Sequence, residues 1–138
     1  MIHKSKRPDV AIPDATVPEH VLGGARRRGE DLALVDGPSG EVLTYGELAD
    51  AVDALAAGLQ KEGLGKGDVV ALVGANSAEW AIAYHAILRA GGVVTPINPL
   101  LTPEEVGKQL SDSKARGVIA MGGLAEPLRP AAEAVGAG

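Results

Sequence analysis

The sequence predicts an α/β fold in three layers, with a mainly parallel sheet flanked by helices and a short N-terminal hairpin. Two observations carry this prediction. Short, nearly unbroken apolar runs occur at 69–73, 93–97 and 117–121, which is typical of strands buried on both faces. Amphipathic segments that open with capping residues lie between these runs, and strands that alternate with helices favour parallel pairing.

Length and composition limit the classes of protein to consider. A chain of 138 residues is long enough for one domain. The lack of cysteine excludes disulfides and thiolate metal sites and fits the cytoplasmic location that we expect. No apolar run reaches about 18 residues, so no membrane span is expected. A net charge of −5 with 2% aromatic residues argues against binding to nucleic acid.

The N-terminal third is predicted to hold an arm, a helix and the hairpin. Residues 1–18 contain three prolines and no periodic pattern, which indicates an extended arm before an α/β unit at 19–138. Residues 18–28 are predicted to form one short helix, with three arginines in a last turn where cations suit the helix dipole. Strands at 31–36 and 41–45, joined by turn residues, are predicted to form the hairpin.

Two further helices are predicted from caps and apolar spacing. Thr44 and Glu47 form a capping box for a helix that continues to Gly63. Asn76 is expected to cap the next helix, which ends at the glycine pair 91–92. Its apolar face begins at Trp80, for which we expect a buried indole.

The C-terminal third repeats this pattern. Thr102 and Glu105 form another capping box, for a helix that continues to about residue 113. Residues 124–135 are predicted as a weaker helix, because Pro127 and Pro130 interrupt it. No strand follows this helix, so the sheet resembles one that is cut part-way.

Two loops are candidates for a phosphate-binding site. The glycine-rich loop 63–67 precedes a strand, whereas a phosphate-binding loop follows a strand and opens a helix, so a turn is favoured. The loop 74–77 does lie between a strand and a helix, and its amides could hold an anion. It matches neither common glycine pattern of nucleotide-binding loops, so we treat a ligand there as the lesser alternative.

The other reactive side chains have structural explanations. His3, His20 and His85 are scattered without metal-binding spacing, and His85 is expected to pack or to be exposed. Ser77 has no nucleophile-elbow pattern around it, and Ser39 is a turn residue. The acidic pair 104–105 suits a helix N-terminus, and Trp80 with Tyr84 is typical of a core. We therefore predict no catalytic, cofactor-binding or metal-binding residue in this chain.

Six segments together resemble the N-terminal portion of AMP-forming acyl-CoA synthetases, and they are most similar to the 4-coumarate–CoA ligase branch. Their order and spacing match along nearly the whole chain. They are residues 5–13, 43–48, 66–70, 76–80, 91–99 and 108–116.

The resemblance implies a parent enzyme of fatty acid or aromatic acid metabolism. Such a ligase uses ATP to convert a carboxylic acid to an acyl-adenylate, and then transfers the acyl group to coenzyme A. The family's phosphate loop, aromatic-Thr-Glu motif, ribose-binding aspartate and lid lysine have no counterpart in residues 1–138. ATP, magnesium and coenzyme A are therefore expected for the full-length parent only. The chain itself is expected to be an inactive scaffold, a partial subdomain of the adenylate-forming fold.

The expected partners follow from this interpretation. They are the remainder of the parent ligase domain and, for the parent, a carboxylic acid. The isolated chain is expected to self-associate through an exposed sheet edge or helix face. Two alternatives stay open: a free-standing non-catalytic α/β interaction module, and a fragment of a peptide-synthetase adenylation domain. Downstream sequence would separate the three.

Overall fold

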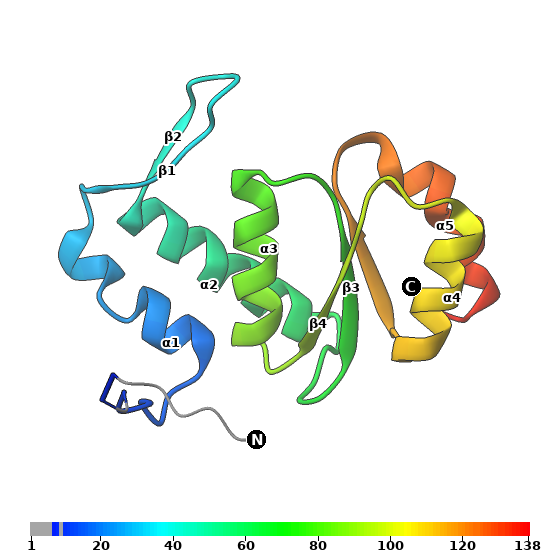
Figure 1. Ribbon diagram of the computed structural model, residues 1–138, viewed down its shortest axis with the longest axis horizontal. Helices are drawn as coiled ribbons and strands as arrows, with labels where there is room; N and C mark the ends of the chain where they lie inside the picture. The colour runs from blue at the N-terminus through cyan, green and yellow to red at the C-terminus, as the bar shows by residue number, and fades with distance from the viewer. Residues whose placement is uncertain (1–6, 9) are drawn as a thin grey trace.

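The centre of the structure is a parallel sheet of three strands in the order β4-β3-β5 (Figure 1). The computed structural model describes residues 7–8 and 10–138. The middle strand is β3, Val69–Val73, with β4, Val93–Ile97, on one side and β5, Gly117–Ala120, on the other. Val70 of β3 lies opposite Val94 of β4 and Gly117 of β5. The predicted parallel sheet is confirmed.

Helices cover both faces of this sheet, which confirms the predicted three layers. On one face α3, Ala78–Arg89, packs on β3 and β4, and α2, Tyr45–Lys61, packs against α3. On the other face lie α4, Pro103–Ser113, and α5, Ala125–Ala134 (Figure 1). In the described part of the chain, no helix is long and apolar enough to cross a membrane.

Two buried clusters correspond to these two faces. The α4/α5 cluster joins the sheet to both C-terminal helices and includes Ala71, Val73, Ile97, Val106, Leu110, Leu128 and Ala132. The α2/α3 cluster joins α2 and α3 to the N-terminal elements and includes Leu22, Ala25, Leu48, Val52, Ala56, Ala86 and Ala90. Many of these side chains are alanines, and small side chains allow neighbouring helices to approach closely.

The N-terminal hairpin forms as predicted, with slightly shorter strands. Strand β1, Leu32–Val35, pairs antiparallel with β2, Val42–Thr44, and the hairpin projects from the helices (Figure 1). The second strand ends at Thr44, because Tyr45 is already the first residue of α2. Asp36 holds the turn, since its Oδ1 accepts hydrogen bonds of 2.8 Å from both the amide and the hydroxyl of Ser39.

The predicted helix at 18–28 is wrong as a single element. The structure has α1, Val17–Leu22, and then a separate 3-10 turn η1, Ala25–Arg28. The glycine pair at 23–24 separates them, and a Cβ on Gly23 would lie 2.4 Å from the Glu19 carbonyl oxygen. The described residues before α1 form no helix or strand, which includes Pro8 and Pro13. The predicted division of the chain at residue 18 stays a prediction.

The three arginines lie in the last turn of η1, and the side chains of Arg26 and Arg28 also contact α2. Arg26 pairs with Asp50 at 2.7 Å and with Asp53 at 3.0 Å, and both aspartates belong to α2. Asp53 also pairs with Arg89 of α3 at 2.7 Å. The Arg28 guanidinium lies 4.0 Å from the centre of the Tyr45 ring, a cation–π contact. This charged layer joins η1, α2 and α3 on the outside of the α2/α3 cluster.

Two other boundaries correct the sequence analysis. Helix α3 is capped by Ser77, whose hydroxyl accepts the Trp80 amide at 3.2 Å, and not by Asn76, which is exposed. Helix α5 continues through both prolines after a 3-10 turn η2, Gly122–Leu124. Pro127 lies in the first turn, where amide hydrogens have no helical acceptor, so only Pro130 removes a hydrogen bond.

The capping boxes are confirmed, and they set the starts of α2 and α4. The Thr44 hydroxyl accepts the Glu47 amide at 3.2 Å, while the Glu47 carboxylate accepts the Thr44 amide at 2.9 Å. Thr102 and Glu105 repeat this exchange. The backbone hydrogen bond from the threonine lowers the pKa of each glutamate, because it stabilises the ionised carboxylate.

We predict that Thr44→Ala lowers the free energy of unfolding by about 1 kcal/mol, because the start of α2 loses its side-chain acceptor. Urea denaturation at neutral pH measures the change. Thr44→Ser is the matched control, since it keeps the hydroxyl and should stay close to the wild type. Equal stability of the alanine and serine variants would contradict a capping role.

Candidate functional site

The carboxyl edge of the sheet is the candidate site, because ligands of open parallel sheets collect beyond the ends of the strands. Three loops meet there: 74–77 after β3, 98–102 after β4 and 121–124 after β5. Together they line a shallow and mostly apolar pocket, formed by Ala75, Ser77, Glu79, Pro99, Met121, Gly122 and Leu124.

Gly74 gives this edge its close packing. A Cβ at Gly74 would lie 2.6 Å from Cγ and 2.7 Å from Cβ of Met121, and 3.5 Å from Cδ1 of Trp80. Real Cβ atoms essentially never come so close to other atoms. The glycine therefore allows side chains from the end of β5 and the start of α3 to meet over the end of β3.

The start of α3 is poorly suited to hold a phosphate. The Ser77 hydroxyl already accepts a hydrogen bond from the Trp80 amide in the first turn of α3. The Glu79 carboxylate lies in the same turn, and its pKa is lowered by a hydrogen bond from its own backbone amide and by one from the Ser77 side chain. A carboxylate at this helix end satisfies the donors and repels a second anion. The interpretation of loop 74–77 as a ligand site gains no support.

The loop after β4 is held by its own backbone and exposes an apolar side chain. Asn98 Oδ1 accepts the Leu100 amide at 3.0 Å, which is an Asx turn. The Leu100 side chain is 89% exposed at the carboxyl edge. An exposed leucine beside the apolar pocket indicates a surface suited to contact with more protein.

The aromatic pair lies on the flank of α3 rather than in the core. The rings of Trp80 and Tyr84 stack with centroids 5.4 Å apart. Trp80 is half-buried, so the expectation of a buried indole is wrong. The buried face of α3 consists of smaller residues, Ala83, Ala86 and Ile87, which bring the helix close to the sheet. The indole instead covers Gly74 from the side.

The histidines do not assemble into a site. His85 is half-buried and meets the Tyr84 ring edge-on, with centroids 5.4 Å apart. Its Nδ1 has no hydrogen-bond partner, and burial lowers the pKa of the imidazole, which favours the neutral form. His20 is exposed on α1, and His3 lies outside the described residues. Among the described residues, no group of three His, Asp or Glu side chains could hold a metal ion.

The glycine-rich loop 63–67 is a turn, and the side chains of Asp68 and Arg116 hold it in place. Gly63 and Gly67 have φ angles of 91° and 87°, which favour glycine. Asp68 Oδ2 accepts the Gly65 amide at 2.8 Å, and this bond, with a second from Arg116, lowers the pKa of the carboxyl. Arg116 pairs with Asp68 and also donates to the Gly63 carbonyl at 2.7 Å. The sequence analysis missed this pair, which lies 48 residues apart.

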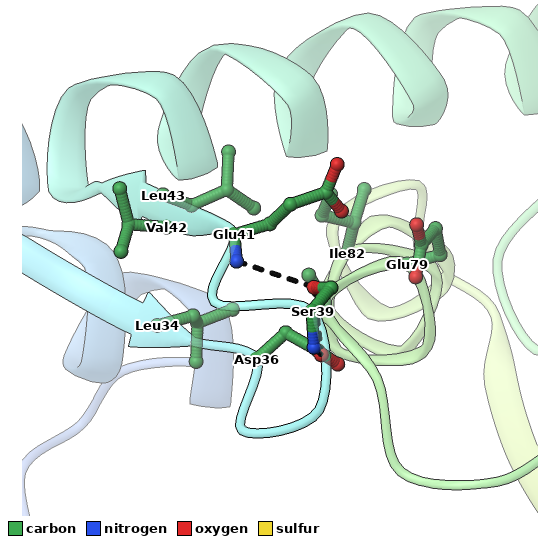
Figure 2. A pocket seen from close by; sticks show the side chains of 9 residues that line it. Leu34, Asp36, Ser39, Glu41, Val42, Leu43, Glu79 and Ile82 are labelled. Carbon is green, nitrogen blue, oxygen red and sulfur yellow. Dashed lines mark hydrogen bonds between the residues drawn. The ribbon is translucent and has the colours of Figure 1, made fainter.

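A second hollow lies between the hairpin and α3. It is a groove of about 620 Å³ lined by Leu34, Asp36, Ser39, Glu41, Val42, Leu43, Ala78, Glu79 and Ile82. Figure 2 shows the carboxylates of Glu41 and Glu79 at this groove, with Ser39 accepting the Glu41 amide at 3.2 Å. Ser39 thus holds the turn, as predicted. The groove is lined by three carboxylates and by no lysine or arginine, and we assign no ligand to it.

Known proteins match this chain over most of its length. The family model described as "AMP-binding enzyme" matches residues 23–137. A 4-coumarate–CoA ligase-like protein of Arabidopsis thaliana is 40% identical over 119 residues, which is 86% of this chain and 22% of that protein. A long-chain-fatty-acid–CoA ligase of Salmonella typhimurium is 43% identical over 110 residues, which is 79% of this chain and 19% of that protein. The chain therefore spans about a fifth of these relatives.

Solved structures agree with the sequence matches. A long-chain-fatty-acid-CoA ligase from Archaeoglobus fulgidus superposes with a TM-score of 0.88 at 25% identity, covering 99% of this chain and 29% of that one. The N-terminal subdomain of Klebsiella oxytoca NpsA, in complex with anthranilyl-AMSN, has a TM-score of 0.70 at 34% identity, covering 76% and 27%. The predicted partial subdomain of the adenylate-forming fold is confirmed.

We predict that Gly74→Ala destabilises the protein by about 1–3 kcal/mol, because the new methyl group must displace Met121. Thermal or urea denaturation measures the effect. Gly123→Ala is the matched control, since a Cβ there meets nothing within 4 Å. Adding Met121→Gly, which removes both the Cβ and the Cγ of Met121, should recover part of the loss, and strict additivity of the two substitutions would contradict the contact.

Proposed function

The chain belongs to the AMP-binding enzyme family, and on that premise we propose that it is the N-terminal scaffold of an ATP-dependent carboxylic acid–CoA ligase. The parent enzyme would convert an acid, ATP and coenzyme A to acyl-CoA, AMP and diphosphate through an acyl-adenylate. The observation that carries the proposal is the match over 23–137, together with two CoA ligases of which this chain spans about a fifth.

The acid would be an aromatic or a fatty acid, since relatives named for each class reach similar identity. The parent would also use magnesium with ATP, and we propose a cytoplasmic location for it. The remaining partner would be the rest of the ligase domain, which would contact the apolar carboxyl edge near Leu100 and Met121.

The described residues of this chain do not themselves fit ATP and magnesium. The one strand-to-helix loop that resembles a phosphate site is closed by Ser77 and by the Glu79 carboxylate. No described cluster of carboxylates or histidines is arranged to hold a metal ion. We therefore assign no catalytic step to this chain, and its contribution is to support the residues that follow.

Two other functions would have different downstream sequences. A carrier domain encoded further along the gene would favour a peptide-synthetase adenylation domain. A stop codon directly after Gly138 would favour a non-catalytic interaction module. A phosphate loop within the next few dozen codons would support the ligase.

We predict that the purified 138-residue chain releases no pyrophosphate above background from ATP with 4-coumarate or a long-chain fatty acid. Adenylate formation depends on positioned donors around the developing charge, and the family motifs that supply them have no counterpart in residues 1–138. A longer protein that contains the family's downstream motifs is the positive control. Steady turnover by the 138-residue chain would refute its role as a scaffold.

We also predict that the isolated chain self-associates, because a short parallel sheet leaves strand edges open. The net charge of −5 opposes association only weakly, since physiological salt screens charges beyond about 8–10 Å. Light scattering after size exclusion at several concentrations measures the effect. A monomer at every concentration, with no binding of a hydrophobic dye, is the result that would contradict it.

A further inference from the structure

Met121 is the one described residue that carries sulfur, because the chain has no cysteine and its other methionine is Met1. The residue follows β5 directly and is the N-cap of η2. Its amide donates to the Val73 carbonyl at 2.8 Å, and its carbonyl accepts the Leu124 amide at 3.4 Å. The backbone of Met121 is therefore held between β3 and η2, and a chemical change in the residue must be accommodated by its side chain.

The side chain of Met121 fills the space over Gly74. Its Cγ and Cβ lie 2.6 and 2.7 Å from the position that a Cβ on Gly74 would take, and Trp80 Cδ1 lies 3.5 Å from that same position. Thioethers are polarizable and pack favourably against aromatic rings. A change in the size or polarity of the Met121 side chain therefore acts on the end of β3 and on the start of α3 together.

The same side chain is accessible from solvent. Met121 is half-buried and forms part of the shallow pocket at the carboxyl edge of the sheet. Methionine sulfur is readily oxidised to the sulfoxide, which turns a flexible apolar side chain into a polar one. A small oxidant that enters the pocket meets Met121 as part of its wall.

The pocket has no free side-chain donor for a sulfoxide oxygen. Among the described residues that line it, only Ser77 has a hydroxyl, which donates to the Glu79 carboxylate and accepts the Trp80 amide at 3.2 Å. The Glu79 carboxylate is itself an acceptor and repels a second one. A polar group is costly to bury without a hydrogen bond, so the oxidised side chain is expected to turn toward water and to leave Gly74 uncovered. The other lining residues have no polar side chain: Ala75, Pro99, Gly122 and Leu124.

We propose that Met121 is a redox-sensitive site, where a hydroperoxide oxidises the thioether and thereby loosens the carboxyl end of the sheet. The sulfur donates a lone pair to one oxygen of hydrogen peroxide, and an S–O bond forms as the O–O bond breaks. The departing hydroxide takes the proton of the transferred hydroxyl group and becomes water. The sulfur is oxidised by two electrons and the peroxide is reduced by two. No step uses ATP or an acid substrate, so the proposal does not depend on the ligase activity.

The test treats the wild-type chain and a Met121→Leu variant with dilute hydrogen peroxide. Leucine has a similar volume and cannot be oxidised, and both chains keep Met1, so any effect of oxidation at Met1 is common to them. Mass spectrometry of peptides measures the oxygen added at Met121. The melting temperature and the fluorescence of Trp80, the only tryptophan, are measured before oxidation, after it, and after treatment with methionine sulfoxide reductases for both epimers.

We expect oxidation of Met121 to lower the melting temperature of the wild-type chain by about 3–6 °C. The emission of Trp80 should shift to longer wavelength, the reductases should reverse both changes, and the Met121→Leu chain should show neither. Three results would each overturn the proposal: a Met121 that peroxide leaves intact, a fully oxidised Met121 with an unchanged or raised melting temperature, and equal changes in the leucine variant.

A second measurement tests the position of the side chain over Gly74. Gly74→Ala displaces Met121 from this position, so peroxide should oxidise Met121 faster in this variant than in the wild type. Gly123→Ala is the matched control, since its Cβ meets nothing within 4 Å, and it should leave the rate unchanged. The rates are compared below the melting temperatures of all three chains. Equal rates in the three chains would show that Met121 is not held over Gly74, and would overturn the proposed coupling.

Discussion

The structure depends on the central strand β3, whose backbone must be paired along both edges and whose side chains must be buried on both faces. The other strands and the helices meet these two needs. Its residues from Val70 to Val73 are at most 4% exposed, and Ala71 and Leu72 are at 0%. Buried amides and carbonyls need partners, so β4 pairs with β3 from Val69 to Val73 and β5 pairs with it from Val70 to Val73. Helix α3 covers one face and helices α4 and α5 cover the other. The two outer strands are less protected than β3, and Val93 of β4 is 48% exposed.

Polar contacts outside the core fix the loops that lead into β3 and β5. Asp68 and Arg116 pair at the points where β3 and β5 begin, and Arg116 also holds the turn at Gly63. The segments 66–70 and 108–116 both resemble the ligase family, and this ion pair joins them. Arg116 is more than half exposed, so the pair sets the alignment of loop and strand more than it adds stability.

The two ends of the sheet have different chemistry. The end with Asp68 and Arg116 is charged and closed by its own hydrogen bonds, whereas the carboxyl end is apolar and exposes Leu100. In open α/β sheets the carboxyl end is the functional one. In the proposed ligase, this apolar carboxyl end would support catalytic residues that another part of the domain contributes.

The sequence by itself determined the order and type of the elements, the capping threonines and the family, because these depend on local spacing and residue type. It failed at some local details, such as the glycine pair 23–24 that divides the predicted helix 18–28. It also failed where a contact came from a distant residue, since Arg26 pairs with Asp50 and Asp53 of α2. Trp80 looked like a core residue, but only the packing of α3 through small side chains places the indole on its flank. The pairing of Gly138 with β5 also needed the tertiary structure, since no local pattern in a glycine-rich end predicts a strand.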